Sequence, residues 1–214
     1  MNLRQLSKFC ESFTSPLDSV LYELERETHL KTLAPQMASG RLQGQFLRFL
    51  SLMMRPKRVL EIGTFTGYSA ICLAEGLPEG GMLHTIEANA ELAHFGKKYF
   101  AKAGISHKIT AHIGDAFDVI PTLDETWDLV FIDAGKTDYT ALYDLVFDRL
   151  RPGGFLLADN TLWDGKVMSG AKDPDTQAIR AFNQKVHDDP RVENALLAVR
   201  DGVMMVRKVE EVRS

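Results

Sequence analysis

The sequence predicts a doubly wound α/β fold, in which a mostly parallel sheet carries helices on both faces. From Val59 onward, apolar runs of strand length alternate with stretches of helix length, and such alternation is typical of parallel sheets with crossover helices. The first apolar run, 59–62, ends at a glycine-bearing turn that leads into a helix, as in Rossmann-like sheets. We expect strands near 57–62, 81–87, 107–113, 126–132 and 152–158, and helices near 67–76, 89–103, 115–124, 138–150 and 174–188.

The C-terminal end breaks this alternation. Two apolar runs, 195–199 and 203–207, are separated by a short segment that ends in Asp201 and Gly202. An Asp-Gly pair between apolar runs is typical of a tight β-hairpin. We therefore expect a C-terminal antiparallel hairpin at the end of the parallel sheet.

Length and composition fit one soluble domain. The chain has 214 residues, of which 45% are hydrophobic and 25% are charged, so it can bury a large core. We expect residues 1–54 to form a helical cover and residues 55–214 to form the α/β core. The polar loop at 34–40 is either part of that cover or a lid over a ligand, and the sequence slightly favours the cover.

The charge and the termini narrow the possible locations and partners. The net charge of −4 gives no general basic surface for nucleic acid, although a local basic patch stays open. No segment has the apolar run of a signal peptide or the length of a membrane span. We therefore expect a cytoplasmic protein without membrane contact.

The turn after the first strand is a candidate binding site. Glu61, Gly63 and Gly67 are spaced as Glu-x-Gly-x-x-x-Gly, between a strand and a helix N-terminus, where free backbone N–H groups gather. Glu87 follows Gly67 by 20 residues, at the predicted end of the second strand. A carboxylate at this offset can bind ribose hydroxyls, whereas the alternative is that Glu87 only caps the next helix.

Polar residues also follow two later strands. Asp133 ends the strand at 126–132, and Asp159 and Asn160 end the strand at 152–158. Two carboxylates and an amide oxygen suit a magnesium-like ion, although Asp and Asn also cap loops. Lys136 lies three residues after Asp133, and a lysine beside a divalent cation has its ammonium form disfavoured, so its pKa should fall toward that of a general base.

Four segments together identify a family resemblance: 37–45, 61–69, 131–136 and 158–166. As a set they resemble the cation-dependent O-methyltransferases, which include the caffeoyl-CoA and catechol enzymes and use S-adenosylmethionine. The resemblance implies that Asp133, Asp159 and Asn160 hold Mg²⁺, or another divalent cation such as Mn²⁺ or Ca²⁺, and that Lys136 and Asp133 are catalytic. It also implies a set of residues that bind the cofactor, namely Ser39, Glu61, Gly63, Thr64, Ser69, Glu87, Asp115, Ala116 and Asp133.

We therefore expect an O-methyltransferase that acts on an aromatic small molecule with vicinal, catechol-like hydroxyls. The plant caffeoyl-CoA enzymes carry an acid at the position of Gly135 and an asparagine at that of Asp164, which weighs against a coenzyme A thioester as the acceptor. Two alternatives stay open: a methyltransferase for hydroxylated uridine in transfer RNA, and a nucleoside-binding protein without catalysis. The family resemblance also implies a homodimer.

Overall fold

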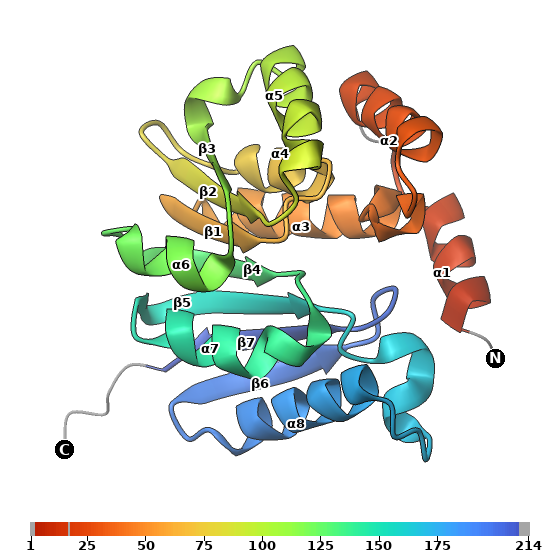
Figure 1. Ribbon diagram of the computed structural model, residues 1–214, viewed down its shortest axis with the longest axis vertical. Coiled ribbons are helices and arrows are strands. Elements are labelled where there is room, and N and C mark those ends of the chain that lie inside the picture. Colours follow the sequence, from red (N-terminus) through yellow and green to blue (C-terminus); the bar gives the residue numbers. More distant parts are fainter. Residues whose placement is uncertain (1–2, 17, 210–214) are drawn as a thin grey trace.

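A computed structural model describes residues 3–16 and 18–209, so what was expected of residues 1–2, 17 and 210–214 lies outside the described residues. Within that part of the chain, seven strands form one sheet with the order β3-β2-β1-β4-β5-β7-β6 (Figure 1). Strands β1 to β5 run parallel, and β7 pairs antiparallel with both β5 and β6. This confirms the predicted fold class. The strands are β1 (Arg58–Ile62), β2 (Met82–Glu87), β3 (Ile109–Ile113), β4 (Trp127–Ile132), β5 (Leu150–Asp159), β6 (Val192–Leu197) and β7 (Val203–Lys208).

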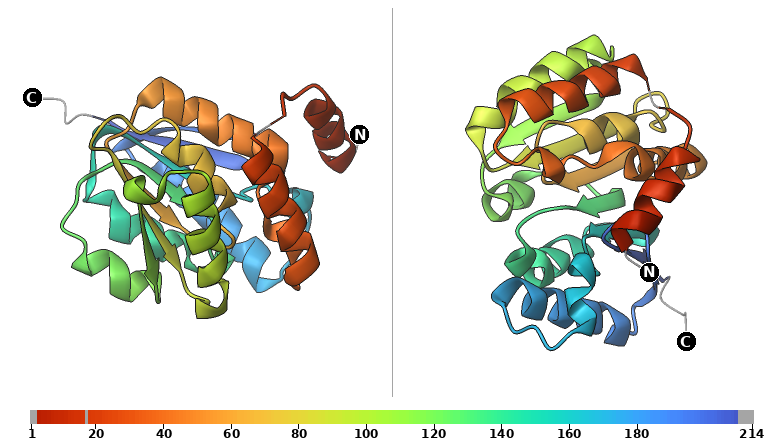
Figure 2. Two further views of the ribbon diagram at one scale, coloured as in Figure 1. Left: turned by 90° about the horizontal axis from the view of Figure 1, so that it is seen from above. Right: turned by 90° about the vertical axis from the view of Figure 1, so that its right-hand side faces the viewer.

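Helices cover both faces of the sheet (Figures 1 and 2). One face carries α2 (Ser19–Lys31), α3 (Gly40–Met54), α4 (Tyr68–Ala74) and α5 (Ala93–Lys102), whose apolar side chains form one core cluster. The other face carries α7 (Tyr139–Phe147) and α8 (Pro174–Asp188), with the short α6 (Ala116–Val119) packed at its margin. Helix α1 (Leu3–Ser12) lies at the periphery in all three views, where it contacts α3. No helix in the described ranges is long and apolar enough to cross a membrane.

The central strands alternate between the two cores, as strand geometry requires. In β1, Val59 packs into the cluster under α2 to α5, and Leu60 packs into the cluster under α7 and α8. Strand β4 departs from this pattern, because Trp127 and Leu129 lie in different clusters. The register of β4 against β5 shifts between these two residues, and such a bulge reverses which face a side chain reaches.

Two local predictions were wrong. The helix expected at 115–124 is an α-helix only over Ala116–Val119, and a 3₁₀ turn, η4 (Ile120–Thr122), follows. Pro121 at the start of this turn cannot donate the hydrogen bond that would extend the α-helix. The C-terminal hairpin exists, but its loop spans the five residues 198–202 and is not a tight turn. Gly202 closes this loop at φ +91, where an added Cβ would lie 2.6 Å from the backbone nitrogen of Leu162.

Four further 3₁₀ turns connect the layers at the carboxyl end of the sheet: η1 (Pro35–Met37), η2 (Ala90–Leu92), η5 (Lys136–Asp138) and η6 (Trp163–Met168). A fifth, η3 (Ser106–Lys108), precedes β3. Parallel strands place their carboxyl ends at one edge, so the residues that follow β1, β2, β4 and β5 meet there. The candidate site lies at this edge.

Candidate active site

A cavity of about 1210 Å³ opens beyond the carboxyl ends of the parallel strands. It is lined by residues that follow β1, β2, β4 and β5, and by segments from η1, η6 and the β6–β7 loop. The loop at 34–40 reaches the cavity through Gln36 and Met37, so this segment is more than a cover over the sheet. Eight of the residues predicted for the site line the cavity: Gly63, Glu87, Asp115, Ala116, Asp133, Lys136, Asp159 and Asn160.

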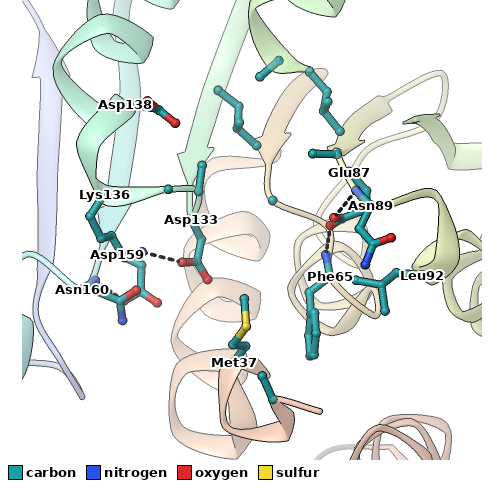
Figure 3. Close-up of a pocket in the computed structure, with 18 of the residues that line it drawn as sticks. Met37, Phe65, Glu87, Asn89, Leu92, Asp133, Lys136, Asp138, Asp159 and Asn160 are labelled. Carbon is teal, nitrogen blue, oxygen red and sulfur yellow. Dashed lines mark hydrogen bonds and ion pairs between the residues drawn. The ribbon is translucent and has the colours of Figure 1, made fainter. Parts of the chain in front are cut away.

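Glu87 lies on one side of this cavity, at the end of β2. Its Oε2 accepts a hydrogen bond from the backbone nitrogen of Phe65 at 2.7 Å, and its Oε1 accepts one from that of Asn89 at 2.9 Å. The helical turn that follows is capped by Asn89, whose side chain accepts from the nitrogen of Glu91. Glu87 is therefore not the helix cap, and its carboxylate is held with both oxygens facing the cavity region (Figure 3).

Gly63 allows the ends of β1 and β4 to approach each other closely. The backbone nitrogen of Asp133 donates to the carbonyl of Ile62 at 2.8 Å, and Gly63 has a φ of +105. A Cβ at position 63 would lie 2.0 Å from the carbonyl oxygen of Asp133, so no other residue fits without a shift of the backbone. The cavity floor between the two strand ends is consequently bare backbone.

The opposite side of the cavity carries Asp133, Asp159, Asn160 and Lys136 (Figure 3). Lys136 Nζ donates to Asp133 Oδ1 at 3.1 Å and to the hydroxyl of Tyr139 at 2.8 Å. The hydroxyl of Tyr139 in turn donates to the backbone carbonyl of Asp159 at 3.0 Å. Lys136 is thus held beside the carboxylates by a fixed set of partners, and its side chain is 10% exposed.

Asp159 is the most buried of these polar residues, at 2% exposure. Burial raises its pKa, the nearby Asp133 carboxylate raises it further, and a hydrogen bond from Gln43 lowers it. In the described part of the chain, no group of three His, Cys, Asp or Glu side chains is arranged to hold a metal. A cation here would therefore use Asn160 as the third protein ligand. Two carboxylates that disfavour each other's charge, with an adjacent amide, form an oxygen donor set that suits a hard divalent ion.

Four of the predicted residues lie behind the cavity wall. Glu61, Thr64 and Ser69 are buried and are absent from the lining, and Ser39 lines a smaller neighbouring cavity of about 250 Å³ beside α1 and α2. Oε2 of Glu61 accepts from the hydroxyl of Thr85 at 2.5 Å. Burial raises the pKa of Glu61 to about 7, although the neighbouring hydroxyls of Ser69 and Thr85 lower it.

Sequence reasoning missed three residues that support the site: Gln43 on α3, Tyr139 on α7 and Arg200 in the β6–β7 loop. Gln43 donates to Asp159, Tyr139 bridges Lys136 and Asp159, and Arg200 donates to Gln43. Gln43 lies within the segment 37–45 that carried the family resemblance, and this was the only signal in the sequence that pointed to it. Tyr139 and Arg200 had no such signal.

Comparison with known proteins places the chain in a family. The family model described as O-methyltransferase matches residues 11–209. The chain belongs to the O-methyltransferase family. The enzyme class expected from the sequence is therefore confirmed, and the alternative of a nucleoside-binding protein without catalysis is not retained.

Individual relatives of this O-methyltransferase agree with that assignment. Caffeoyl-CoA O-methyltransferase 2 from Populus trichocarpa is 33% identical over 187 residues, which cover 81% of this chain and 76% of the relative. Among solved structures, the O-methyltransferase TomG from Streptomyces achromogenes, in complex with SAM, has a TM-score of 0.88 and 30% identity, with 96% of each chain covered. An O-methyltransferase from Bacillus cereus in complex with SAH has a TM-score of 0.87 and 29% identity, and covers 95% of this chain and 97% of its own.

Proposed function

We propose that this O-methyltransferase transfers a methyl group from S-adenosylmethionine to a vicinal hydroxyl of a catechol-like aromatic small molecule, and that the reaction depends on a divalent cation. The observation that carries the proposal is the lining of one cavity. Glu87 lies on one side of that cavity, and Asp133, Asp159, Asn160 and Lys136 lie on the other. A nucleoside and an acceptor held at these two groups would be neighbours, as methyl transfer requires.

The cofactor assignment follows the residues along the cavity. Glu87 would bind the ribose hydroxyls with the lone pairs left by its two backbone hydrogen bonds, and Asp115 and Ala116 would contact the adenine. The bare backbone at Gly63 would allow the methionine end to approach closely. Four further residues would support the methionine end from behind the cavity wall: Ser39, Glu61, Thr64 and Ser69. The related structures named above support this, because TomG and the Bacillus cereus enzyme were solved with SAM and SAH.

The cation would be held by Asp133, Asp159 and Asn160. These residues would supply hard oxygen ligands of the kind that such ions prefer, and oxygens of the acceptor would add to them. The buried negative charge of Asp159 beside Asp133 fits a cation, since a nearby positive charge stabilises both carboxylates. When bound, a magnesium-like ion supplies a Lewis acid that stabilises negative charge on the acceptor oxygen.

In its neutral amine form, Lys136 would accept the proton of the acceptor hydroxyl. The Tyr139 hydroxyl directs its own proton to the carbonyl of Asp159 and offers a lone pair to Lys136 Nζ. This arrangement aims the nitrogen of Lys136 at the carboxylate cluster, where the hydroxyl would lie. Lys136 would thus take the proton while the methyl group moves from sulfur to oxygen.

The acceptor end of the cavity favours a small molecule that carries no phosphate groups. Asp138, Asp175 and Asp201 line it, in addition to the two proposed cation ligands. These charges disfavour the phosphates of coenzyme A or RNA. Trp163 also lines this end, with Lys136 Nζ 5.9 Å from its ring, and offers an aromatic surface for stacking.

The transfer RNA alternative finds little support at the site. Lys166, Lys172 and Arg180 follow the Asp-Asn pair and were the basic residues available for a groove. The guanidinium of Arg180, however, donates to the carbonyls of Val167 and Ala171 within this same segment, and so holds the loop in place. These hydrogen bonds within the protein compete with any contact between Arg180 and an RNA phosphate.

We also propose that the enzyme forms a homodimer. Large apolar side chains are exposed on or directly after the N-terminal helices, including Phe9 at 63%, Phe13 at 79% and Met53 at 73%. Exposed apolar groups of this size are typical of protein interfaces. Light scattering coupled to size exclusion measures the mass directly, and a monomer of 24.0 kDa would contradict the proposal.

The test of function is label transfer from methyl-labelled S-adenosylmethionine. Purified enzyme is offered caffeic acid or a simple catechol beside unmodified transfer RNA, with Mg²⁺ or with a chelator. We expect label in the phenol only when Mg²⁺ is present. Label in RNA would contradict the proposed phenolic acceptor. Transfer that persists in the presence of the chelator would contradict the requirement for a divalent cation. A monohydroxy phenol of the same size serves as the control for the vicinal-hydroxyl requirement.

A further inference from the structure

Gln43 is a fully buried polar residue on α3 that connects the proposed cation site to the β6–β7 loop. Its Nε2 donates to Oδ2 of Asp159 at 2.8 Å, and its Oε1 accepts from the guanidinium of Arg200 at 2.7 Å. The three residues come from α3, the end of β5 and the β6–β7 loop. They form one chain of hydrogen bonds that ends on a carboxylate of the site.

The chemistry of the two neighbours fixes the orientation of the Gln43 amide. Arginine carries only donors, and an ionised carboxylate carries only acceptors. The amide oxygen must therefore face Arg200 and the amide nitrogen must face Asp159, because the flipped amide would lose both bonds. Arg200 itself is anchored, since it also donates to the backbone carbonyls of Ser39 and Ala38.

The hydrogen bonds to Asp159 fix the orientation of its carboxylate without neutralising it. Oδ1 accepts from the backbone nitrogen of Asn160 at 2.8 Å, and Oδ2 accepts from Gln43. Both donors are neutral, so they do not neutralise the carboxylate, and each oxygen keeps a free lone pair. Asp133 differs in this respect, because its partner is the ammonium group of Lys136. A lysine or arginine at position 43 would compete with a cation for Asp159, whereas an apolar residue would leave the carboxylate free to rotate.

We propose that Gln43 is a positioning residue for the cation site, and that Arg200 holds the Gln43 amide in the orientation that site needs. The inference rests on the proposed function, because it requires that Asp159 bind a cation. Partners of this kind orient metal ligands, and their loss typically weakens metal affinity by about 10- to 100-fold.

The test is the binding of Mn²⁺ alone, measured by electron paramagnetic resonance of the free ion, with S-adenosylmethionine affinity measured separately by calorimetry. We expect Gln43→Leu to weaken Mn²⁺ binding about 10- to 100-fold and to leave cofactor affinity unchanged. Arg200→Met should weaken Mn²⁺ binding by a smaller factor, because Gln43 can still donate when its amide has the correct orientation. A purely structural role would reduce the melting temperature without this selective loss of Mn²⁺.

Gln45→Leu is the matched control. Gln45 lies on the same helix and is 6% exposed, but its amide donates to the carbonyl of Ser15 at 3.1 Å and has no path to Asp159. We expect wild-type Mn²⁺ affinity in this variant. Equal Mn²⁺ affinity in wild type and in folded Gln43→Leu would overturn the inference alone. Should Gln43→Leu not fold, Arg200→Met decides the question in the same way.

Different outcomes would contradict the cation site and the positioning role of Gln43. If the wild-type enzyme takes up no Mn²⁺, the proposed cation site itself is wrong. If the wild type binds Mn²⁺ and the Gln43 and Arg200 variants bind it equally well, the cation site stands and only the positioning role is lost.

Discussion

Replacement of Glu87 by alanine is the sharpest test of where the cofactor lies. Each oxygen of the Glu87 carboxylate already accepts one backbone hydrogen bond, at 2.7 Å from Phe65 and 2.9 Å from Asn89. One further lone pair on each oxygen is free for a ribose hydroxyl. A hydrogen bond to a charged group contributes about 1.5–3 kcal/mol, so the loss of two such bonds should cost at least about 3 kcal/mol, which is about a 150-fold weaker dissociation constant.

The same substitution also disturbs the protein, and the assay must separate the two effects. Without the carboxylate, the backbone nitrogens of Phe65 and Asn89 lose their partner, so a lower melting temperature is expected as well. Calorimetric titration with S-adenosylmethionine, carried out well below the melting temperature, measures the affinity of the folded enzyme. Near-wild-type affinity for Glu87→Ala would refute the ribose assignment.

Glu91→Ala is the charge-matched control for this experiment. Glu91 lines the same cavity, and its replacement by alanine removes one negative charge, whereas its hydrogen bonds to Asn89 and His94 are made by its backbone. We expect this variant to retain cofactor affinity within a few-fold. A loss equal to that of Glu87→Ala would mean that net charge, and not a ribose contact, explains both results.

Three further outcomes are expected. Lys136→Met should reduce kcat at least about 100-fold, as for loss of a general base, while calorimetry shows unchanged cofactor affinity. Asp159→Ala should no longer be activated by Mg²⁺ in initial-rate measurements; wild-type rates in this variant would contradict the cation site. Burial raises the pKa of Glu61 from 4.5 to about 7, so its ionisation should cost the apo enzyme about 3 kcal/mol as pH rises from below 4.5 to above 7. Urea unfolding of wild type and Glu61→Gln at pH 5 and pH 8 measures this cost. The free energy of unfolding of the variant should exceed that of wild type by more at pH 8 than at pH 5. Equal differences at the two pH values would contradict the expected cost.

The residues at strand ends were predictable because topology places them. Once the alternation of strands and helices indicated a parallel sheet, Glu87, Asp133 and Asp159 had to emerge at one edge, and each lines the cavity. Gly63 was predictable for the same reason, since the close approach of β1 and β4 at that edge leaves no room for a side chain. These inferences depend on local sequence and on a rule of sheet geometry, and no knowledge of packing is needed.

Where each side chain would end relative to the cavity wall was less predictable. Glu61 in β1 and Ser69 in α4 flank the turn that carries Gly63, but both are buried. Strand alternation fixes which face of the sheet a side chain reaches, but not how deeply packing buries it, so a residue that shares a face with the lining is not thereby exposed to a ligand. The five-residue loop of the C-terminal hairpin was also missed, because its conformation is set by contact of Gly202 with Leu162 and not by the Asp-Gly pair alone.

The residues that support the site could not be found from strand ends, because they come from helices on both faces of the sheet. Gln43 reaches Asp159 from α3 on one face, and Tyr139 reaches the backbone carbonyl of the same residue from α7 on the other. Asp159 is therefore held between the two cores, and the direction of its carboxylate depends on how both layers pack against β5. Such a dependence leaves no periodic signal in the sequence around either Gln43 or Tyr139. It also means that a substitution in either core that shifts α3 or α7 relative to β5 should alter the cation site before it alters the nucleoside side of the cavity, where Glu87 is held by the backbone of its own loops.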